Sequence, residues 1–379
     1  MNAALPWLDA RRAEAIESFR VKGVPHRRIE EWKYSDLRSA LTADEVPVAG
    51  AAKWQVEGDK ANIEIVDLSQ LGADAPQWVR DHLGAIAPQN AMEAASLAFA
   101  QGGVALRVAR NMAAGSFRLN VSEAGHARIL IVMEEGSSLT LVETHAAAQG
   151  LRNIGMEISL APNAQLFHIA IAQEAQTGVR VETIAVKASR DARYNAHFAN
   201  FGARLSRFDI AVALEGEGAE ARLSGVSALA NDTHADVTTH VIHSVGHTQS
   251  TQLFKYAAGD HSRAVYQGRV TVREGANGSD SRQTAKGILL GQRAEIDLKP
   301  ELIIFADDVK CAHGATVGDL EAEQLFYLRT RGIPEAEARN VLIRAFLEDA
   351  VLEIADEAIR ADVWNAVEAA LSAVLENPS

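Results

Sequence analysis

The sequence predicts a mainly β protein in which a long central β-region lies between two helical ends. After residue 103 the chain consists of short runs of alternating apolar and polar residues separated by small turns. Some of these turns recur at intervals of 28 and then 27 residues. Apolar residues at helical spacing occur mainly before residue 103 and after residue 322. Because no helical pattern separates the strands, a coiled or stacked β-architecture or a β-sandwich is favoured over βαβ units.

Composition limits the class of protein. A net charge of −13 over 379 residues argues against nucleic acid or an anionic membrane as the main partner. One cysteine excludes an intramolecular disulfide framework and fits a reducing compartment. No run approaches 18 apolar residues, and charged residues interrupt the first twenty. We therefore expect no transmembrane helix, no signal peptide and a cytoplasmic location.

Residues 1–103 form the expected N-terminal helical region. Leu5–Val21 has loosely helical spacing, which Gly23 and Pro25 end. Leu83–Ala100 is rich in alanine and predicts a second helix. Between them, Trp32 and Tyr34 are interpreted as core anchors rather than as part of a cofactor site.

Residues 104–322 form the expected β-region. Several of its runs begin with a turn followed by a small residue, and the first such alanines are Ala164, Ala192 and Ala219. Each repeat is long enough for about two short strands. The period alone leaves a β-sandwich open.

Residues 323–379 form the expected C-terminal helical region. Pro334 suits a first helical turn, and acidic residues after it complement the positive end of the helix dipole. Two amphipathic stripes follow, and their residues are Ile343, Phe346, Leu347, Ala350, Val351 and Ile354, then Trp364, Val367, Leu371 and Val374.

The strongest candidate for chemistry is the pair Cys311 and His313. Thiolate and imidazole bind transition metals and iron–sulfur clusters, and residues two apart on a strand face the same side. Lys310 and His313 would favour the ionised thiol. Two ligands cannot complete a site that needs about four, so the others must come from elsewhere. The alternative is a buried cysteine that packs as a small hydrophobe.

A second group of candidates is the set of histidines His234, His240, His243 and His247. The β-branched residues between them favour a strand, on which His240 faces away from His243 and His247. We favour ordinary exposed or hydrogen-bonded positions over a metal site. The sequence contains no phosphate-binding loop with the required Lys and Ser or Thr, and no common hydrolase motif, so we expect no enzymatic activity.

Three stretches then carry a resemblance to a known family. Ala306–Ile333 (ADDVKCAHGATVGDLEAEQLFYLRTRGI) is similar to the C-terminal signature of the SufD family, a scaffold component of the SUF iron–sulfur cluster assembly machine. Gly268–Leu290 resembles the stretch that precedes this signature in SufB and SufD proteins, and Pro25–Leu37 resembles the family's N-terminal motif. The usual serine between cysteine and histidine is Ala312 here, which removes one hydroxyl.

The resemblance implies a right-handed parallel β-helix core between the helical ends. It also implies a non-enzymatic scaffold that pairs with a SufB-like subunit and a SufC-like ATPase. Without these partners, a homodimer is an alternative. Cys311 and His313 would contribute to a transient iron or iron–sulfur site shared with SufB. No permanently bound cofactor is expected, and a flavin in the assembled complex remains open.

The resemblance further implies that SufC docks on the segment Gln324–Ile354. The residues expected to carry this contact are Gln324, Leu325, Phe326, Arg331, Phe346 and Leu347.

Two other functions compete with this interpretation. The first is a β-helix enzyme acting on polysaccharide, for which Arg293, Glu301, Asp307 and Asp308 are the available groups. The second is a homodimeric metal-binding adaptor that uses the histidine group.

Overall fold

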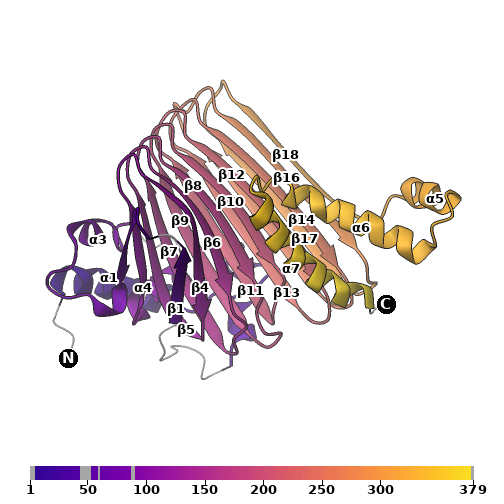
Figure 1. Cartoon of the computed structure of the whole chain (residues 1–379), viewed down its shortest axis with the longest axis horizontal. Helices are drawn as coiled ribbons and strands as arrows, with labels where there is room; N and C mark the ends of the chain where they lie inside the picture. Colours follow the sequence, from indigo (N-terminus) through magenta and orange to yellow (C-terminus); the bar gives the residue numbers. More distant parts are fainter. Residues whose placement is uncertain (1–4, 43–52, 59, 87–89, 377–379) are drawn as a thin grey trace.

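A computed structural model describes residues 5–42, 53–58, 60–86 and 90–376. Over these residues the chain winds into a β-helix with two faces, each a nine-stranded sheet (Figure 1). The first sheet contains β2 (Ile63–Asp67), β3 (Gly103–Val108), β5 (Gly125–Met133), β7 (Leu151–Leu160), β9 (Val179–Ala188), β11 (Leu205–Leu214), β13 (His234–His243), β15 (Arg263–Val272) and β17 (Glu295–Ile304). The second contains β1 (Lys53–Gly58), β4 (Ala113–Ser122), β6 (Ser138–His145), β8 (Gln165–Ala172), β10 (Arg193–Asn200), β12 (Glu220–Leu229), β14 (Gln249–Ala258), β16 (Asp280–Leu289) and β18 (Lys310–Gly318).

From β3 onward, successive strands alternate between the two sheets, and each pairs in parallel with the strand two further along the chain. Only β1 with β4 and β2 with β3 pair antiparallel among the described strands. This topology confirms the predicted parallel β-helix and excludes the β-sandwich, whose sheets are antiparallel.

The predicted repeat is the length of one coil. Gln165 pairs with Arg193, and Arg193 pairs with Glu220, so these coils advance by 28 and 27 residues. Before each small residue, one residue has a positive φ, for example 62° at Asn163 and 57° at Asp191. Asn and Asp tolerate this left-handed conformation better than other residues with a side chain. The alanine that follows is fully buried.

The interior lies between the two sheets. Alternate residues of each strand point inward and form one large apolar cluster, which includes Leu141, Ile184, Phe208 and Tyr266. Where helices also cover the outer face of a strand, nearly all of its residues are buried, as in β5. Several buried arginine, glutamate and histidine side chains interrupt this interior.

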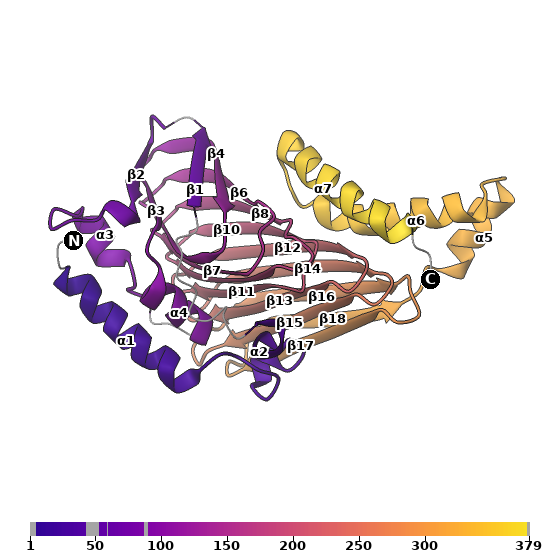
Figure 2. The same cartoon turned by 90° about the horizontal axis from the view of Figure 1, so that it is seen from below.

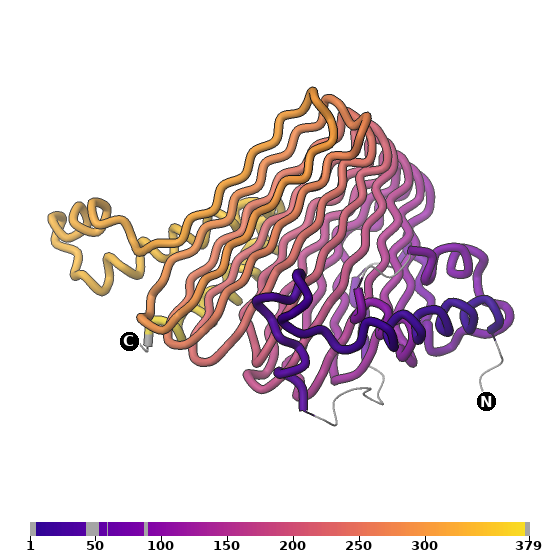
Figure 3. The backbone as a smooth tube through the Cα atoms, turned by 180° about the vertical axis from the view of Figure 1, so that it is seen from behind, coloured from indigo at the N-terminus to yellow at the C-terminus, as the bar shows by residue number. Residues whose placement is uncertain are grey.

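The N-terminal region contains α1 (Pro6–Lys22), η1 (Glu30–Trp32), α2 (Leu37–Ala40), η2 (Leu68–Gln70), α3 (Gln77–His82) and α4 (Ala91–Phe99), in addition to β1 and β2. The predicted first helix is confirmed. The second begins only at Ala91, because Asn90 is extended and its side chain accepts hydrogen bonds from the N–H groups of Met92 and Glu93. Figures 2 and 3 show the N-terminal segment running across the outer face of the first sheet.

Trp32 anchors this segment, as the sequence predicts. It is 2% exposed, and the guanidinium of Arg207 from β11 lies 4.1 Å from the centre of its ring. Arg207 is itself buried and bonded to Asp236 of β13 at 2.6 Å. The hydroxyl of Ser35 donates to the same carboxylate. An aromatic contact and a buried ion pair therefore fix the N-terminal segment to two strands.

The C-terminal region contains α5 (Ala322–Thr330), α6 (Glu335–Val351) and α7 (Glu357–Glu376). Both predicted stripes are buried against the outer face of the second sheet, where they meet Ile169, Ile171 and Val226. α5 projects beyond the β-helix and packs on α6 (Figures 1 and 2). Within the described residues, no helix combines the length and apolar character needed to span a membrane.

Candidate functional site at the open end of the β-helix

The last coil leaves one end of the β-helix uncovered. β17 and β18 are the final strands of their sheets, and no described strand pairs with their outer edges. In contrast to the preceding coils, β17 is half-buried along most of its length and most of β18 is exposed. Ile304 is 40% exposed, Phe305 64% and Val317 39%. Unpaired main-chain groups beside apolar side chains form a surface suited to strand pairing with another chain.

Cys311 and His313 both lie on β18, as the sequence analysis requires. Cys311 pairs in register with Ser281 and His313 with Gln283, and both of these β16 residues are buried. The two candidate ligands therefore lie on the side of β18 that continues the inward-facing rows of β16. Cys311 is half-buried and His313 is exposed, so the end of the interior opens at this pair.

Two rows of polar side chains inside the β-helix lead to these residues. In the first, Ser250 Oγ lies 2.9 Å from His243 Nε2 and 2.8 Å from Ser281 Oγ, and Ser281 pairs with Cys311.

In the second row, Gln283 Nε2 donates to Tyr266 Oη at 2.9 Å, and Tyr266 Oη donates to Gln252 Oε1 at 3.1 Å. Gln283 pairs in register with His313, and its buried Oε1 has no hydrogen-bond partner among the described residues. This oxygen is a ready acceptor for an imidazole N–H, which would fix the orientation of the ring.

The expected ionisation of Cys311 is wrong for this chain. Burial and the negative charge of Asp280 raise the pKa of the Cys311 thiol, and these effects outweigh a backbone hydrogen bond at Ser281. The sequence analysis considered only the neighbours Lys310 and His313, whereas Asp280 comes from the adjacent strand. The isolated chain therefore holds a protonated thiol, which a metal ion would have to deprotonate on binding.

The four clustered histidines do not form one site. His243 is buried inside and bonds Thr248 and Ser250, whereas His240 is on the outer face and lies 3.0 Å from Thr271 Oγ1. His234 lies 3.0 Å from Ser35 Oγ. His247 is an exposed corner residue with φ 55°. The strand therefore separates their side chains, which agrees with the ordinary positions favoured above.

The six residues expected to contact an ATPase have different environments. On α5, Gln324 and Phe326 are exposed and Leu325 is half-buried, and Arg331 is exposed in the following turn. On α6, Phe346 is half-buried under Lys255, whose Nζ lies 4.7 Å from the ring centre. Leu347 is fully buried against the second sheet. The accessible part of the segment is thus α5 and the turn after it.

Comparisons with known proteins identify the family. Residues 117–346 match the SufBD core domain of the SUF system for FeS cluster assembly, and residues 1–60 match the SufBD N-terminal region. The chain belongs to the SufBD family. It is 28% identical over 373 residues to the iron–sulfur cluster assembly protein SufD of Escherichia coli, covering 90% of this chain and 88% of that protein.

Other SufBD relatives match a shorter part. A SufBD family protein of Synechocystis, slr0076, is 32% identical over 230 residues, which cover 58% of this chain and 51% of that protein. The chloroplastic protein ABCI7 of Arabidopsis thaliana is 30% identical over 261 residues, which cover 68% of this chain and 54% of that protein. The matches thus span about half the length of these two relatives. The similarity to SufD of Escherichia coli covers most of both chains, and the function of this SufBD protein lies in iron–sulfur cluster assembly.

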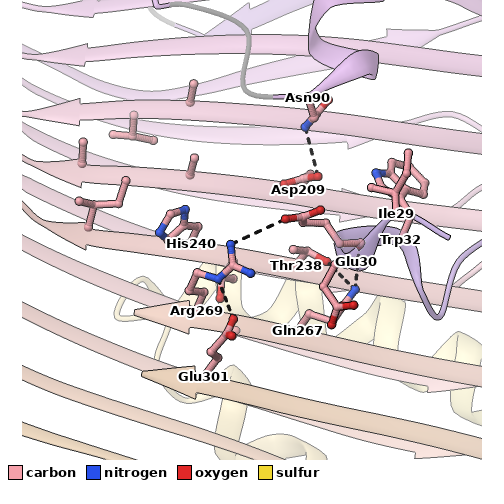
Figure 4. A pocket seen from close by; sticks show the side chains of 18 of the residues that line it. Ile29, Glu30, Trp32, Asn90, Asp209, Thr238, His240, Gln267, Arg269 and Glu301 are labelled. Carbon is pink, nitrogen blue, oxygen red and sulfur yellow. Dashed lines mark hydrogen bonds and ion pairs between the residues drawn. The ribbon is translucent and has the colours of Figure 1, made fainter. Parts of the chain in front are cut away.

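The groups considered for a polysaccharide enzyme do not form an acid–base pair in this SufBD protein. Glu301 of β17 accepts a hydrogen bond from Arg269 at 2.7 Å on the outer face, whereas Asp307 and Asp308 lie in the loop before β18. Glu301 also lines a groove of about 640 Å³ between the N-terminal segment and the first sheet (Figure 4). Asp209, His240 and Arg269 project into this groove from neighbouring strands.

Sequence reasoning missed one buried group. Glu143, His145 and Glu182 place one potential ligand atom each within 4.8 Å of one another, inside the β-helix. The signal was present in two places, because Glu143 and His145 are two apart on β6, and Arg180 and Glu182 are two apart on β9. Inward-facing charged pairs on strands otherwise rich in apolar residues are costly unless they have partners.

Proposed function

We propose that this SufBD protein is a non-enzymatic scaffold subunit that pairs through its open end with a SufB-like β-helix. The observation that carries the proposal is the position of Cys311 and His313 on β18, whose outer edge no described strand covers, beside exposed apolar residues. A second β-helix end could extend both sheets by strand pairing. Its side chains would then lie next to Cys311 and His313.

The shared site would hold iron or an iron–sulfur cluster as a transient substrate. One thiol and one imidazole supply two of the roughly four ligands that such a site requires, so a partner has to supply the remainder. Incomplete ligation by each subunit allows a cluster to be built and released as the subunits move apart. Gln283 would orient His313 from below through its unpartnered oxygen.

A SufC-like ATPase would dock on the projecting α5 arm. Phe326 is 69% exposed and Tyr327, which has the guanidinium of Arg331 over its ring, is 56% exposed, so two adjacent aromatic residues face solvent. Exposed aromatic side chains of this kind are common energetic centres of interfaces. Movement of the arm on ATP binding would pass through α6 to the second sheet, on which α6 packs.

A cytoplasmic location fits a function that needs Cys311 as a free thiol. No resident cofactor is part of the proposal. A flavin in the assembled complex and a homodimer of the isolated chain stay predictions.

The test is anaerobic co-expression of the tagged chain with SufB-like and SufC-like proteins of the same organism, followed by native mass spectrometry. We expect one copy of this chain with one SufB-like and two SufC-like subunits. Cys311→Ala and His313→Ala should leave this complex intact but impair cluster build-up, followed by visible absorption after iron and sulfide supply. His261→Ala, which changes an exposed histidine between β14 and β15, is the matched control.

Two outcomes would overturn the proposal. Recovery of this chain without either protein would separate the family membership from the proposed assembly. Undiminished cluster build-up in the complex that carries both Cys311→Ala and His313→Ala would show that the open end does not hold the cluster.

A further inference from the structure

A buried polar group divides the apolar interior at the corner where β6 and β8 lead to β7 and β9. Glu143 and His145 project inward from β6, and His168 projects inward from β8. Glu182 and Arg180 reach the same place from β9 in the opposite sheet. All five side chains are completely buried.

The arrangement leaves coordination capacity unused. Within the described residues, neither ring nitrogen of His145 has a hydrogen-bond partner, and the same holds for Glu143 Oε1 and Glu182 Oε1. The imidazole of His145 faces two carboxylates at ion-pair distance but makes no well-aligned hydrogen bond to either, so burial removes its hydration with little compensation. A bound cation or an added proton would compensate for that loss.

Distances within the group suit a small cation. His145 Nε2 lies 3.3 Å from Glu182 Oε2 and 3.5 Å from Glu143 Oε1. Metal–ligand bonds of about 2.05 Å in tetrahedral geometry separate neighbouring ligand atoms by about 3.3 Å. The observed separations therefore leave room for an ion between the three side chains after small rotations.

Charge leads to the same conclusion. The buried groups at this corner comprise three carboxylates, Glu143, Glu174 and Glu182, and two guanidiniums, Arg152 and Arg180. With all carboxylates ionised, one positive charge is missing from the corner. A cation or a proton has to supply it, because an uncompensated charge in this interior is costly.

The other side chains support the ligands in the way that metal sites require. His168 Nε2 lies 3.0 Å from Glu143 Oε2, and His168 Nδ1 lies 3.0 Å from Tyr194 Oη. Arg180 Nη1 donates to Glu182 Oε2 at 2.6 Å. A neighbouring side chain thus holds one oxygen of each carboxylate and fixes its orientation, as hydrogen-bonded neighbours do for ligands in metal sites.

The corner lies next to an exposed loop. Arg152 and Glu174 form an ion pair of 2.6 Å at the same corner, and Gln173, Gln176 and Thr177 of the loop beside it are exposed.

We propose that Glu143, His145 and Glu182 bind one divalent transition-metal ion inside the β-helix. One imidazole and two carboxylates fit Zn²⁺, Fe²⁺ or Co²⁺, whereas Ca²⁺ and Mg²⁺ prefer six or more oxygen ligands. The ion would join the two sheets and stabilise the fold. This site is separate from the open end and stands apart from the proposed scaffold function.

The test begins with the metal content of the full chain, expressed in zinc-supplemented medium and washed with chelator, by inductively coupled plasma mass spectrometry. We expect about one metal ion per chain, retained in the Cys311→Ser/His313→Ala double variant and lost in His145→Gln and Glu182→Gln. His168→Gln should weaken binding about 10- to 100-fold. His197→Gln, which changes a buried histidine outside the group, should keep the metal.

A second measurement does not depend on the folding of any variant. Chain grown with Co²⁺ should show the visible d–d absorption of a site with nitrogen and oxygen ligands, without a thiolate charge-transfer band. Absorption from a cobalt–thiolate bond would assign the metal to Cys311 and overturn the proposal. Metal-free chain from zinc-supplemented cells would also overturn it, and would assign the missing positive charge to a proton.

Discussion

Leu347 and Phe326 lie in one C-terminal segment, yet replacing each with alanine should affect a different property: the stability of the fold for Leu347 and the binding of a partner for Phe326. Leu347 is fully buried in the apolar cluster that α6 and α7 form with the second sheet. Phe326 is 69% exposed on the projecting α5. The first change should therefore destabilise the packing of α6, and the second should weaken partner binding alone.

The magnitude follows from burial. Leu347→Ala removes a fully buried side chain from a closely packed interface, and such changes cost about 2–5 kcal/mol. A central value of about 3 kcal/mol makes opening of α6 about 150-fold more frequent. Leu347→Met conserves volume and should cost less than about 1.5 kcal/mol. Phe326→Ala should change stability by less than about 0.5 kcal/mol.

Hydrogen–deuterium exchange of peptides within residues 335–351 measures this opening directly. Leu347→Ala should speed exchange there by about two orders of magnitude, whereas Phe326→Ala should leave it unchanged and reduce recovery of the SufC-like protein. Equal protection of α6 in wild type and Leu347→Ala would refute the packing argument. Loss of α6 protection in Phe326→Ala would show that α5 supports the fold instead of presenting a free surface.

Three further predictions concern single residues. Burial lowers the pKa of His197 to about 3, below the unfolded value near 6.5. The contribution of this group to the free energy of unfolding is therefore complete above pH 6.5 and is lost as the pH falls, by about 1.4 kcal/mol per pH unit. In urea unfolding, His197→Gln should lose less stability than wild type between pH 7 and pH 5. Asp236→Asn leaves Arg207 with a weakened buried counter-charge and should cost about 3 kcal/mol, seen as earlier proteolytic release of the N-terminal segment, and an unchanged digestion pattern would contradict this. Since the pKa of the Cys311 thiol is raised, its alkylation by iodoacetamide should be slow at pH 7 and accelerate steadily up to pH 9, and a rate that is already maximal at pH 7 would show an ionised thiol.

Local patterns in the sequence predicted much of the fold. The 28- and 27-residue spacing of small residues after turns is the length of a coil, because each coil needs the same corner at the same place. The stripes around Leu347 and Val367 predicted the faces of α6 and α7, since helical periodicity alone decides which side chains share a face. The choice of a β-helix over a sandwich came from the family resemblance, and the alternating strand order confirmed it.

The sequence by itself also placed Cys311 and His313 on one side of a strand, because residues two apart on an extended chain face the same way. Only the tertiary structure decided the surroundings of this pair. Burial, together with the negative charge of Asp280 from the neighbouring strand, raises the pKa of the Cys311 thiol. The buried Glu143 and Glu182 come together from opposite sheets across the interior. Electrostatics and metal coordination depend on distance in space, which a linear pattern does not contain until the coils are stacked.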